Sequence, residues 1–142
     1  MRISDVIRRK GDLVVTVRSD ETVERLIAML DEHRIGALVV SDDDGAVSGI
    51  VSERDVVRQL HSAGGAVLQQ TVADIMTRDV FTCSPDDPID ELARQMTERR
   101  VRHVPVVVDG RLRAIVSIGD VVKQRIDELQ TERDQLVGYI QQ

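Results

Sequence analysis

The chain contains two copies of one sequence pattern, and this duplication constrains its fold more than any other feature. The segment Ile50–Gln59 (IVSERDVVRQ) returns 65 positions later as Ile115–Gln124 (IVSIGDVVKQ). Upstream, five pairs of identical residues are separated by 66 positions: Thr16 and Thr82, Asp20 and Asp86, Leu26 and Leu92, Glu32 and Glu98, Arg34 and Arg100. The second copy has therefore lost one residue between the two blocks. The loss falls in a predicted turn, where changes of length cost least.

Each copy is too short to bury a large core by itself, because about 55–60 residues is a marginal size for independent folding. We therefore expect the two copies to pack face to face with pseudo-twofold symmetry. Such packing leaves paired, related clefts between the copies, and we expect the function to lie there.

The composition argues against nucleic-acid binding. The net charge is −6, and Phe81 and Tyr139 are the only aromatic residues. A phosphate backbone demands a basic face, and single strands are usually held by aromatic stacking. Cys83 is the only cysteine, so an intramolecular disulfide and a cysteine zinc site are excluded. We expect Cys83 to be a buried, inert thiol.

No segment marks the chain for a membrane. Met1–Asp5 lacks an apolar signal core, and no apolar run approaches the length of a membrane span. We expect a soluble, cytoplasmic module that stands alone, without membrane or nucleic-acid partners. His33, His61 and His103 lack metal-ligand spacing, and no nucleophile arrangement is visible. We therefore expect neither a metal site nor an enzyme.

The first copy has the pattern of strand, helix, strand, strand and helix. We expect a short strand over Leu13–Val17 and a helix capped by Ser19–Thr22. Two further strands are predicted at 35–40 and 47–51, on either side of an Asp-Gly turn. A second helix begins at Ser52.

The second copy repeats this order. Asp87 supplies an acceptor at a predicted helix cap, and Pro88 is the predicted first helical residue. Strands are expected over 101–108 and 112–116. Between the copies, residues 61–66 form a linker of small residues.

The last stretch predicts a helix from Asp120 to about Ile140, longer than its counterpart in the first copy. Its apolar residues keep near-heptad spacing, with Arg133 as an interruption: Val122, Ile126, Leu129, Leu136 and Ile140. This face either packs back on its own domain or pairs with a second subunit.

A Ser-x-x-Asp motif occurs at the same place in both copies, as Ser52 with Asp55 and Ser117 with Asp120. A serine at a helix start can cap the free backbone N–H groups there, and those groups together with the helix dipole favour a phosphate. The aspartate one turn later can accept both hydroxyls of a ribose. The motif is also an ordinary capping box, but its duplication favours a nucleotide site.

Each half resembles a CBS motif, and the chain resembles a stand-alone CBS pair (a Bateman module) from about Ile3 to Leu129. The resemblance depends on the β-α-β-β-α order and on four features: Thr16 and Thr82 in the first strands, His103–Pro105 in a middle strand, the Asp-Gly hairpin, and the Ser-x-x-Asp helix start. It implies an α/β (α+β) fold of two packed motifs with pseudo-twofold symmetry and an extended C-terminal helix. The implied boundaries are 1–61, 62–71 (linker), 72–127 and 128–142.

The resemblance also implies a function, namely a regulatory sensor without a catalytic cofactor. Its ligand would be AMP, ADP, ATP or a related adenosyl compound, bound in clefts between the motifs. In this family the aspartate holds the ribose, the serine touches phosphate, the first-strand threonine lines the cleft and the middle strand contacts adenine. Carried onto this sequence, the binding residues are Thr16, Gly36, Ala37, Ser52, Arg54 and Asp55 in the first copy, and Thr82, Arg102, His103, Pro105, Ser117 and Asp120 in the second.

The two copies differ in ways that predict unequal clefts. Gly36–Ala37 corresponds to Arg102–His103, whose side chains offer donors to phosphate. Gly49, where the second copy has Ala114, is expected to let a ligand approach the backbone. Arg99–Arg100 is expected to be surface charge.

Two other functions remain open beside the sensor. One is a ligand-free structural or partner-binding module, acting through a homodimer, the C-terminal helix and an unidentified protein target. The other is an enzyme, for which the sequence offers no catalytic group. Adenine nucleotides should raise the melting temperature of a sensor and leave a scaffold unchanged.

Overall fold

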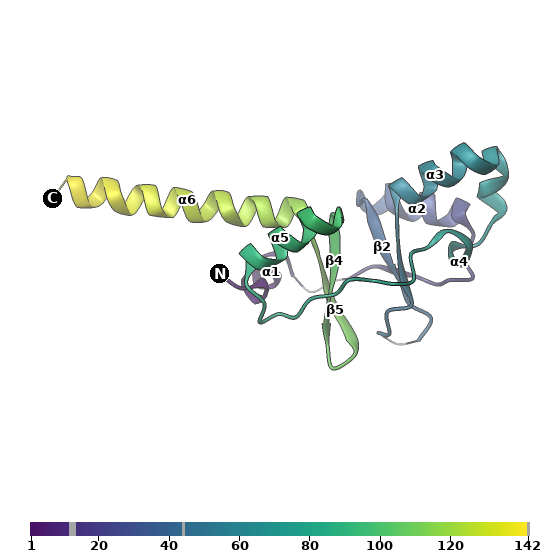
Figure 1. Cartoon of the computed structure of the whole chain (residues 1–142), viewed down its shortest axis with the longest axis horizontal. Helices are drawn as coiled ribbons and strands as arrows, with labels where there is room; N and C mark the ends of the chain where they lie inside the picture. Colours follow the sequence, from purple (N-terminus) through teal and green to yellow (C-terminus); the bar gives the residue numbers. More distant parts are fainter. Residues whose placement is uncertain (12–13, 44, 142) are drawn as a thin grey trace.

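The computed structural model describes residues 1–11, 14–43 and 45–141. Two halves lie side by side, and a long helix projects away from the second half (Figure 1). The elements are α1 (Ile3–Lys10), β1 (Thr16–Val17), α2 (Val23–His33), β2 (Ala37–Val40), β3 (Gly49–Ser52), α3 (Glu53–Ala63), the 3₁₀ helix η1 (Gly64–Gln69), α4 (Val72–Ile75), α5 (Ile89–Arg99), β4 (His103–Val108), β5 (Arg111–Ser117) and α6 (Ile118–Ile140). The expected α/β fold with a long C-terminal helix is confirmed.

The first half contains a three-stranded sheet in the order β1-β2-β3. Strand β1 is parallel to β2, and β2 is antiparallel to β3. The first strand is shorter than predicted, since only Thr16–Val17 pairs and Leu13 lies outside the described residues.

The second half has a two-stranded sheet of β4 and β5, and the predicted first strand shrinks to a single bridge. Cys83 donates its N–H to Pro105 O at 3.0 Å, and Val107 donates to Cys83 O at 2.9 Å. Pro105 stands where the first copy has Val39, whose position pairs with Thr16. Because proline has no N–H, the parallel ladder cannot extend further at this point.

Helices α2 and α5, which occupy equivalent places in the two copies, have different N-caps but the same kind of C-cap. Thr22 caps α2 as predicted, accepting a hydrogen bond from Arg25 N at 3.1 Å. The cap prediction for α5 was wrong, because its N-cap is Pro88 and the Asp87 carboxylate instead accepts from Ser84 N at 2.9 Å. Both helices end at left-handed arginines at equivalent positions, Arg34 and Arg100.

The two cores do not follow the boundaries of the two copies, because α4 at the start of the second copy packs in the first half and α1 at the start of the first copy packs in the second half. The core of the first half includes Val67 from η1 and Val72 and Ile75 from α4. Its other buried residues are Val17, Val23, Leu26, Leu30, Leu38, Val40 and Val51. The core of the second half includes Ile3 and Val6 from α1. Its other buried residues are Cys83, Ile89, Leu92, Met96, Val104, Val106, Ala114, Val116 and Val121. Residues 61–66, predicted as a linker, lie in α3 and η1. The exchange of segments means that each half needs the other.

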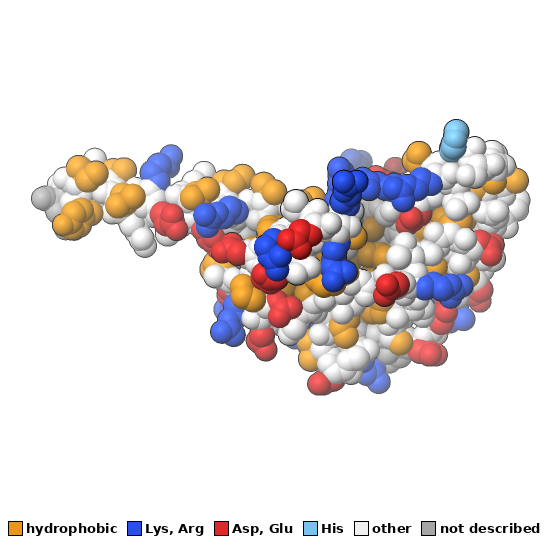
Figure 2. Space-filling model, viewed as in Figure 1, with side chains coloured by type: hydrophobic (Ala, Val, Ile, Leu, Met, Phe, Trp, Pro, Cys, Tyr) orange, Lys and Arg blue, Asp and Glu red, His pale blue; other side chains and the backbone are white. Residues whose placement is uncertain are grey.

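Helix α6 does not fold back on its own domain. It leads away from α1 and α5 into solvent (Figure 1), with apolar side chains along its exposed surface (Figure 2). The residues of the predicted stripe are between 48% and 79% exposed: Val122, Ile126, Leu129, Leu136 and Ile140. Of the two alternatives for this face, packing on its own domain is therefore not observed.

Candidate functional site in the cleft between the halves

A cavity of about 280 Å³ lies between the two halves and takes walls from both. Seven of the predicted binding residues line it: Gly36, Ala37, Ser52, Arg54, Asp55, Arg102 and His103. The remaining lining residues are Ile50, Glu53, Arg58, Thr77, Asp79, Val80, Phe81, Arg100 and Val101. The tertiary structure thus joins the Ser-x-x-Asp motif of the first copy to the Arg-His pair of the second.

The start of α3 supplies one polar side of this cavity. Ser52 donates its N–H to Asp55 Oδ2 at 2.9 Å and its hydroxyl to the same oxygen at 3.1 Å, while Asp55 N donates to Ser52 Oγ at 3.4 Å. This is a capping box. Within the described residues the other carboxylate oxygen of Asp55, Oδ1, has no hydrogen-bond partner. It is therefore available to accept from a ligand.

A second wall is formed by the segment after α4, which pairs with β3. Ile50 and Thr77 exchange two backbone hydrogen bonds of 2.9 Å. A Cβ atom at Gly49 would lie 2.8 Å from Thr77 O and 2.8 Å from Met76 Sδ. The prediction that Gly49 makes room for a ligand was therefore wrong. Its missing side chain makes room for the protein's own backbone, which lets Thr77 reach the cavity.

His103 lies at the boundary between the halves. A Cβ atom at Gly36 would lie 3.3 Å from His103 Cε1, so the absence of a side chain there leaves room for the imidazole. Burial lowers the pKa of His103; the positive charge of Lys10 lowers it further, while Asp120 and Glu53 act in the opposite direction. The imidazole is therefore largely neutral at pH 7 and can donate one hydrogen bond and accept another.

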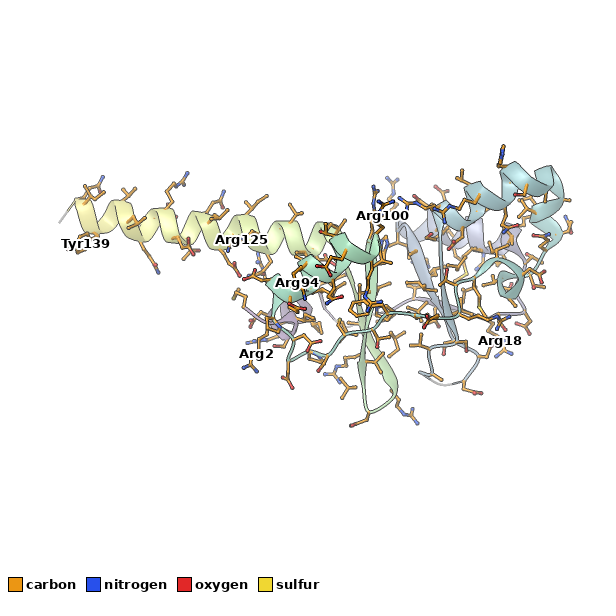
Figure 3. The ribbon with its side chains drawn as sticks, viewed as in Figure 1. Arg2, Arg18, Arg94, Arg100, Arg125 and Tyr139 are labelled. Carbon is orange, nitrogen blue, oxygen red and sulfur yellow. The ribbon has the colours of Figure 1, made fainter. Side chains whose placement is uncertain are left out.

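Four arginines line the cavity: Arg54, Arg58, Arg100 and Arg102. Positive side chains gather along the upper edge of the molecule where the halves meet (Figure 2), and Arg100 stands at that edge on the second half (Figure 3). In the described part of the chain no carboxylate forms an ion pair with any of the four. Guanidinium groups without a partner suit phosphate, which accepts two parallel hydrogen bonds from one arginine.

The second Ser-x-x-Asp motif has the same local geometry but different surroundings. Ser117 N donates to Asp120 Oδ2 at 2.9 Å, and Asp120 N donates to Ser117 Oγ at 3.2 Å. Lys10 Nζ also donates to Asp120 Oδ2, at 2.8 Å, and to Ile115 O, at 2.8 Å. Burial raises the pKa of Asp120, but the hydrogen bonds from Lys10 and Ser117 outweigh it and leave the pKa below its usual value.

The space beside Asp120 is smaller than the first cavity. It measures about 150 Å³ and is lined by Val6, Arg9, Lys10, Asp120, Lys123 and Gln124. Of the other predicted binding residues, Ser117 lies outside both cavities. Thr16 and Thr82 are exposed and also lie outside both, and Pro105 is buried in β4.

Sequence reasoning missed several residues of the first cavity. Arg58 follows Arg54 by one helical turn, so its spacing was a usable signal. Arg100, expected to be surface charge, lines the cavity. Its neighbour Arg99 lies over the Phe81 ring, 4.3 Å from the centroid. Phe81 and Thr77 line the cavity because distant segments of the chain lie together in the fold, and no local sequence pattern indicates this.

Other chemistry finds little support. Cys83 is buried, as expected, and burial raises the pKa of its thiol to about 12. Over the described ranges, no group of three or more His, Cys, Asp or Glu side chains is placed to hold a metal ion. Among the same residues, no helix combines the length and apolarity needed to cross a bilayer.

Comparison with known proteins identifies the family. The CBS domain model matches residues 3–62 and 72–127. The chain is 35% identical over 147 aligned positions to the mitochondrial CBS domain-containing protein CBSX3 of Arabidopsis thaliana, covering 98% of this chain and 71% of that protein. Another curated relative is much longer, and the chain spans 34% of it.

Solved structures agree with this match. The crystal structure of the CBS-domain containing protein ATU1752 from Agrobacterium tumefaciens has a TM-score of 0.86 at 46% identity, covering 88% of this chain and 99% of that one. The CBS domain pair of protein MJ0100, in complex with 5′-methylthioadenosine and S-adenosyl-L-methionine, has a TM-score of 0.78 at 27% identity, with 87% and 98% covered. The chain belongs to the CBS domain family, as a tandem pair of CBS domains.

Proposed function

We propose that this CBS pair is a regulatory module that binds a phosphate-bearing adenosine ligand in the cavity between its halves. One observation carries the proposal: the cavity brings the Ser52–Asp55 helix start together with arginines from both halves that form no ion pair with any described carboxylate. The adenosyl compounds bound by the related MJ0100 pair support an adenosine ligand in this fold.

Each side of the cavity has a separate role in this proposal. Asp55 Oδ1 accepts the ribose hydroxyls, and the N-terminus of α3 with Ser52 faces the first phosphate. Arg102, Arg100 and Arg58 hold further phosphates. S-Adenosylmethionine carries a positive sulfonium, which four arginines would repel. We therefore propose AMP, ADP or ATP as the ligand class, with the more phosphorylated nucleotides binding more tightly.

Regulation follows from where the ligand sits. Because both halves contribute walls, a ligand there has a higher affinity for the packing that closes the cavity, and it shifts the population toward that packing. The response is then passed to an unidentified protein target. The ligand is not transformed, so the module is proposed to be regulatory and not an enzyme.

The proposal is tested by thermal denaturation and calorimetry of nucleotide-stripped protein with ATP, ADP, AMP, adenosine and S-adenosylmethionine. A ligand at 100 times its Kd adds about 2.7 kcal/mol to the free energy of unfolding, which is a rise of several degrees in Tm. Asp55→Ala should abolish this rise for every ligand. If no ligand raises the Tm of the wild type, the ligand-free partner-binding module is the better account.

Asp74→Ala is the matched control for Asp55→Ala. Asp74 forms the same kind of capping box in α4, accepting from Thr71 N at 3.0 Å, and it does not line the cavity. Each substitution removes a cap, at a cost of about 1 kcal/mol. Only Asp55→Ala should lose the response to nucleotide. Equal losses in both variants would assign the effect to stability and not to ribose recognition.

We also propose that the module is a homodimer and that α6 pairs with α6 of a second copy. Five of its exposed apolar residues, with Arg133 at one position between them, follow alternate steps of four and three, the spacing of a two-helix seam: Val122, Ile126, Leu129, Leu136 and Ile140. Arg133 lies within this seam. A parallel, in-register pair would bring two Arg133 side chains together, whereas an antiparallel pair centred away from Arg133 would place each against an apolar residue. Ile126→Asp should convert the dimer to a monomer in sedimentation experiments, and a wild type that is monomeric at high concentration would contradict the pairing.

A further inference from the structure

The two aspartates of the Ser-x-x-Asp motifs, Asp55 and Asp120, differ in whether a cationic side chain of the same chain pairs with the carboxylate. Asp120 is held by Lys10, whereas within the described residues Asp55 has no cationic partner. The difference comes from the helices that precede the two copies. Helix α1 has eight residues and ends at Lys10, but α4 has four and ends at Ile75. The extra turn of α1 carries Lys10 onto the second motif.

We propose that Lys10 is a built-in occupant of the second site, so that each chain binds one adenosine ligand, at Asp55. The inference rests on the proposed function for the first cleft. An ammonium group has three donors, and Lys10 uses two of them on Asp120 Oδ2 and on Ile115 O, each at 2.8 Å. Lys10 holds Asp120 Oδ2 and, within the described residues, leaves Oδ1 without a hydrogen bond. Lys10 also lines the cavity beside Asp120, so a ribose there would compete with the ammonium group for the charge of the carboxylate and for space.

The lysine is held in place by its neighbours. Arg9 donates to Gln124 Oε1 at 3.0 Å and forms an ion pair with Asp127, so α1 is fixed to α6. Gln124 is only 2% exposed. The side chains of Lys10 and Asp120 are 37% and 23% exposed, which makes their pair less accessible to water than an ordinary surface ion pair. A ligand must therefore displace an arrangement that is already ordered.

A simpler role for Lys10 would be to fasten α1 to α6, as Arg9 does. The two roles predict different results, because fastening affects only stability, while occupation affects the number of ligands bound. Arg9→Ala is therefore the matched control: it removes contacts between the same two helices and leaves Asp120 covered. Lys10→Met keeps most of the apolar stem and removes the charge.

The test is calorimetric titration of nucleotide-stripped protein with ATP. The wild type and Arg9→Ala should each bind one ATP per chain, and Lys10→Met should bind two. In the Lys10→Met background, Asp120→Asn should remove the second event and Asp55→Ala the first. Circular dichroism confirms that each variant is folded before titration.

The outcomes separate this inference from the proposed function. Two ATP molecules on the wild type, or one on Lys10→Met, would overturn the role of Lys10. No binding by the wild type but one Asp120-dependent ATP on Lys10→Met would support the role of Lys10 and contradict a site at Asp55. No binding by either protein would contradict both.

Discussion

The clefts around Asp55 and Asp120 begin from the same local structure and end with different chemistry. In each, the serine N–H donates to the aspartate Oδ2 at 2.9 Å and a helix starts at the next residue. Around Asp55 lie a cavity of about 280 Å³ and arginines that, across residues 1–11, 14–43 and 45–141, pair with no carboxylate. Around Asp120 the neighbour is Lys10. The motif specifies how a helix starts, and segments far away in the sequence decide what the carboxylate can bind.

The strands that precede α3 and α6 also differ, because Gly49 in β3 corresponds to Ala114 in β5. A Cβ atom at Gly49 would lie 2.8 Å from the backbone oxygen of Thr77, so Gly49→Ala should cost about 1–3 kcal/mol through overpacking. Ala114 is 2% exposed, and Ala114→Gly should cost about 0.5–1 kcal/mol. Urea unfolding of both variants measures the difference. A cost for Gly49→Ala that is no larger than the cost for Ala114→Gly would contradict the predicted overpacking against Thr77.

The arginines offer a sharper comparison of ligands. Arg102→Ala should weaken the binding of ATP by at least about tenfold, because a hydrogen bond to a charged group contributes about 1.5–3 kcal/mol, and should leave the binding of adenosine nearly unchanged. Arg113→Ala is the control, since Arg113 lies on β5 and outside the cavity. Calorimetry with ATP and with adenosine measures how much each variant changes the Kd of each ligand relative to the wild type. If Arg102→Ala weakens ATP and adenosine equally, its contact with phosphate is contradicted.

His103 connects the two regions, and its titration should give the smallest effect. Burial, followed by the charge of Lys10, lowers its pKa below the usual 6.5. Protonation is then less favourable in the folded state than in the unfolded state, so stability is complete above pH 6.5 and falls as the pH drops below it. His103→Gln should remove this part of the acid-side loss in urea unfolding at pH 7.5 and 5.5.

The pKa of His103 also reports on Lys10, which distinguishes the cleft at Asp120 from the cleft at Asp55. Lys10→Met removes a nearby positive charge, so the pKa of His103 should rise, as measured by NMR of the imidazole. An unchanged or lower pKa would contradict the position of Lys10 near both His103 and Asp120.

Features set by neighbouring residues were predictable from the sequence. The Asp109-Gly110 hairpin, the Thr22 cap and the long α6 follow from short patterns whose partners lie within a few positions. Asp44 of the first predicted Asp-Gly turn lies outside the described residues. The duplication then predicted that residues of both copies meet, and seven of the candidate site residues do line one cavity.

Features that depend on contacts between distant segments were not predictable. The pairing of Thr77 with Ile50 explains Gly49, and the length of α1 explains Lys10. Pro105 was assigned to the site from a resemblance, whereas its missing N–H shortens a strand. Arg100 is exposed, as expected for surface charge, but it also lines the cavity, which the run of two arginines does not indicate. In each case the chemistry depends on a partner from elsewhere in the chain.

The most direct test of the account is a titration of nucleotide-stripped wild type, Asp55→Ala and Asp120→Ala with ATP. The account predicts one ATP per chain for the wild type and for Asp120→Ala, and none for Asp55→Ala. Binding that survives Asp55→Ala and disappears in Asp120→Ala would place the ligand in the other cleft and contradict the central claim.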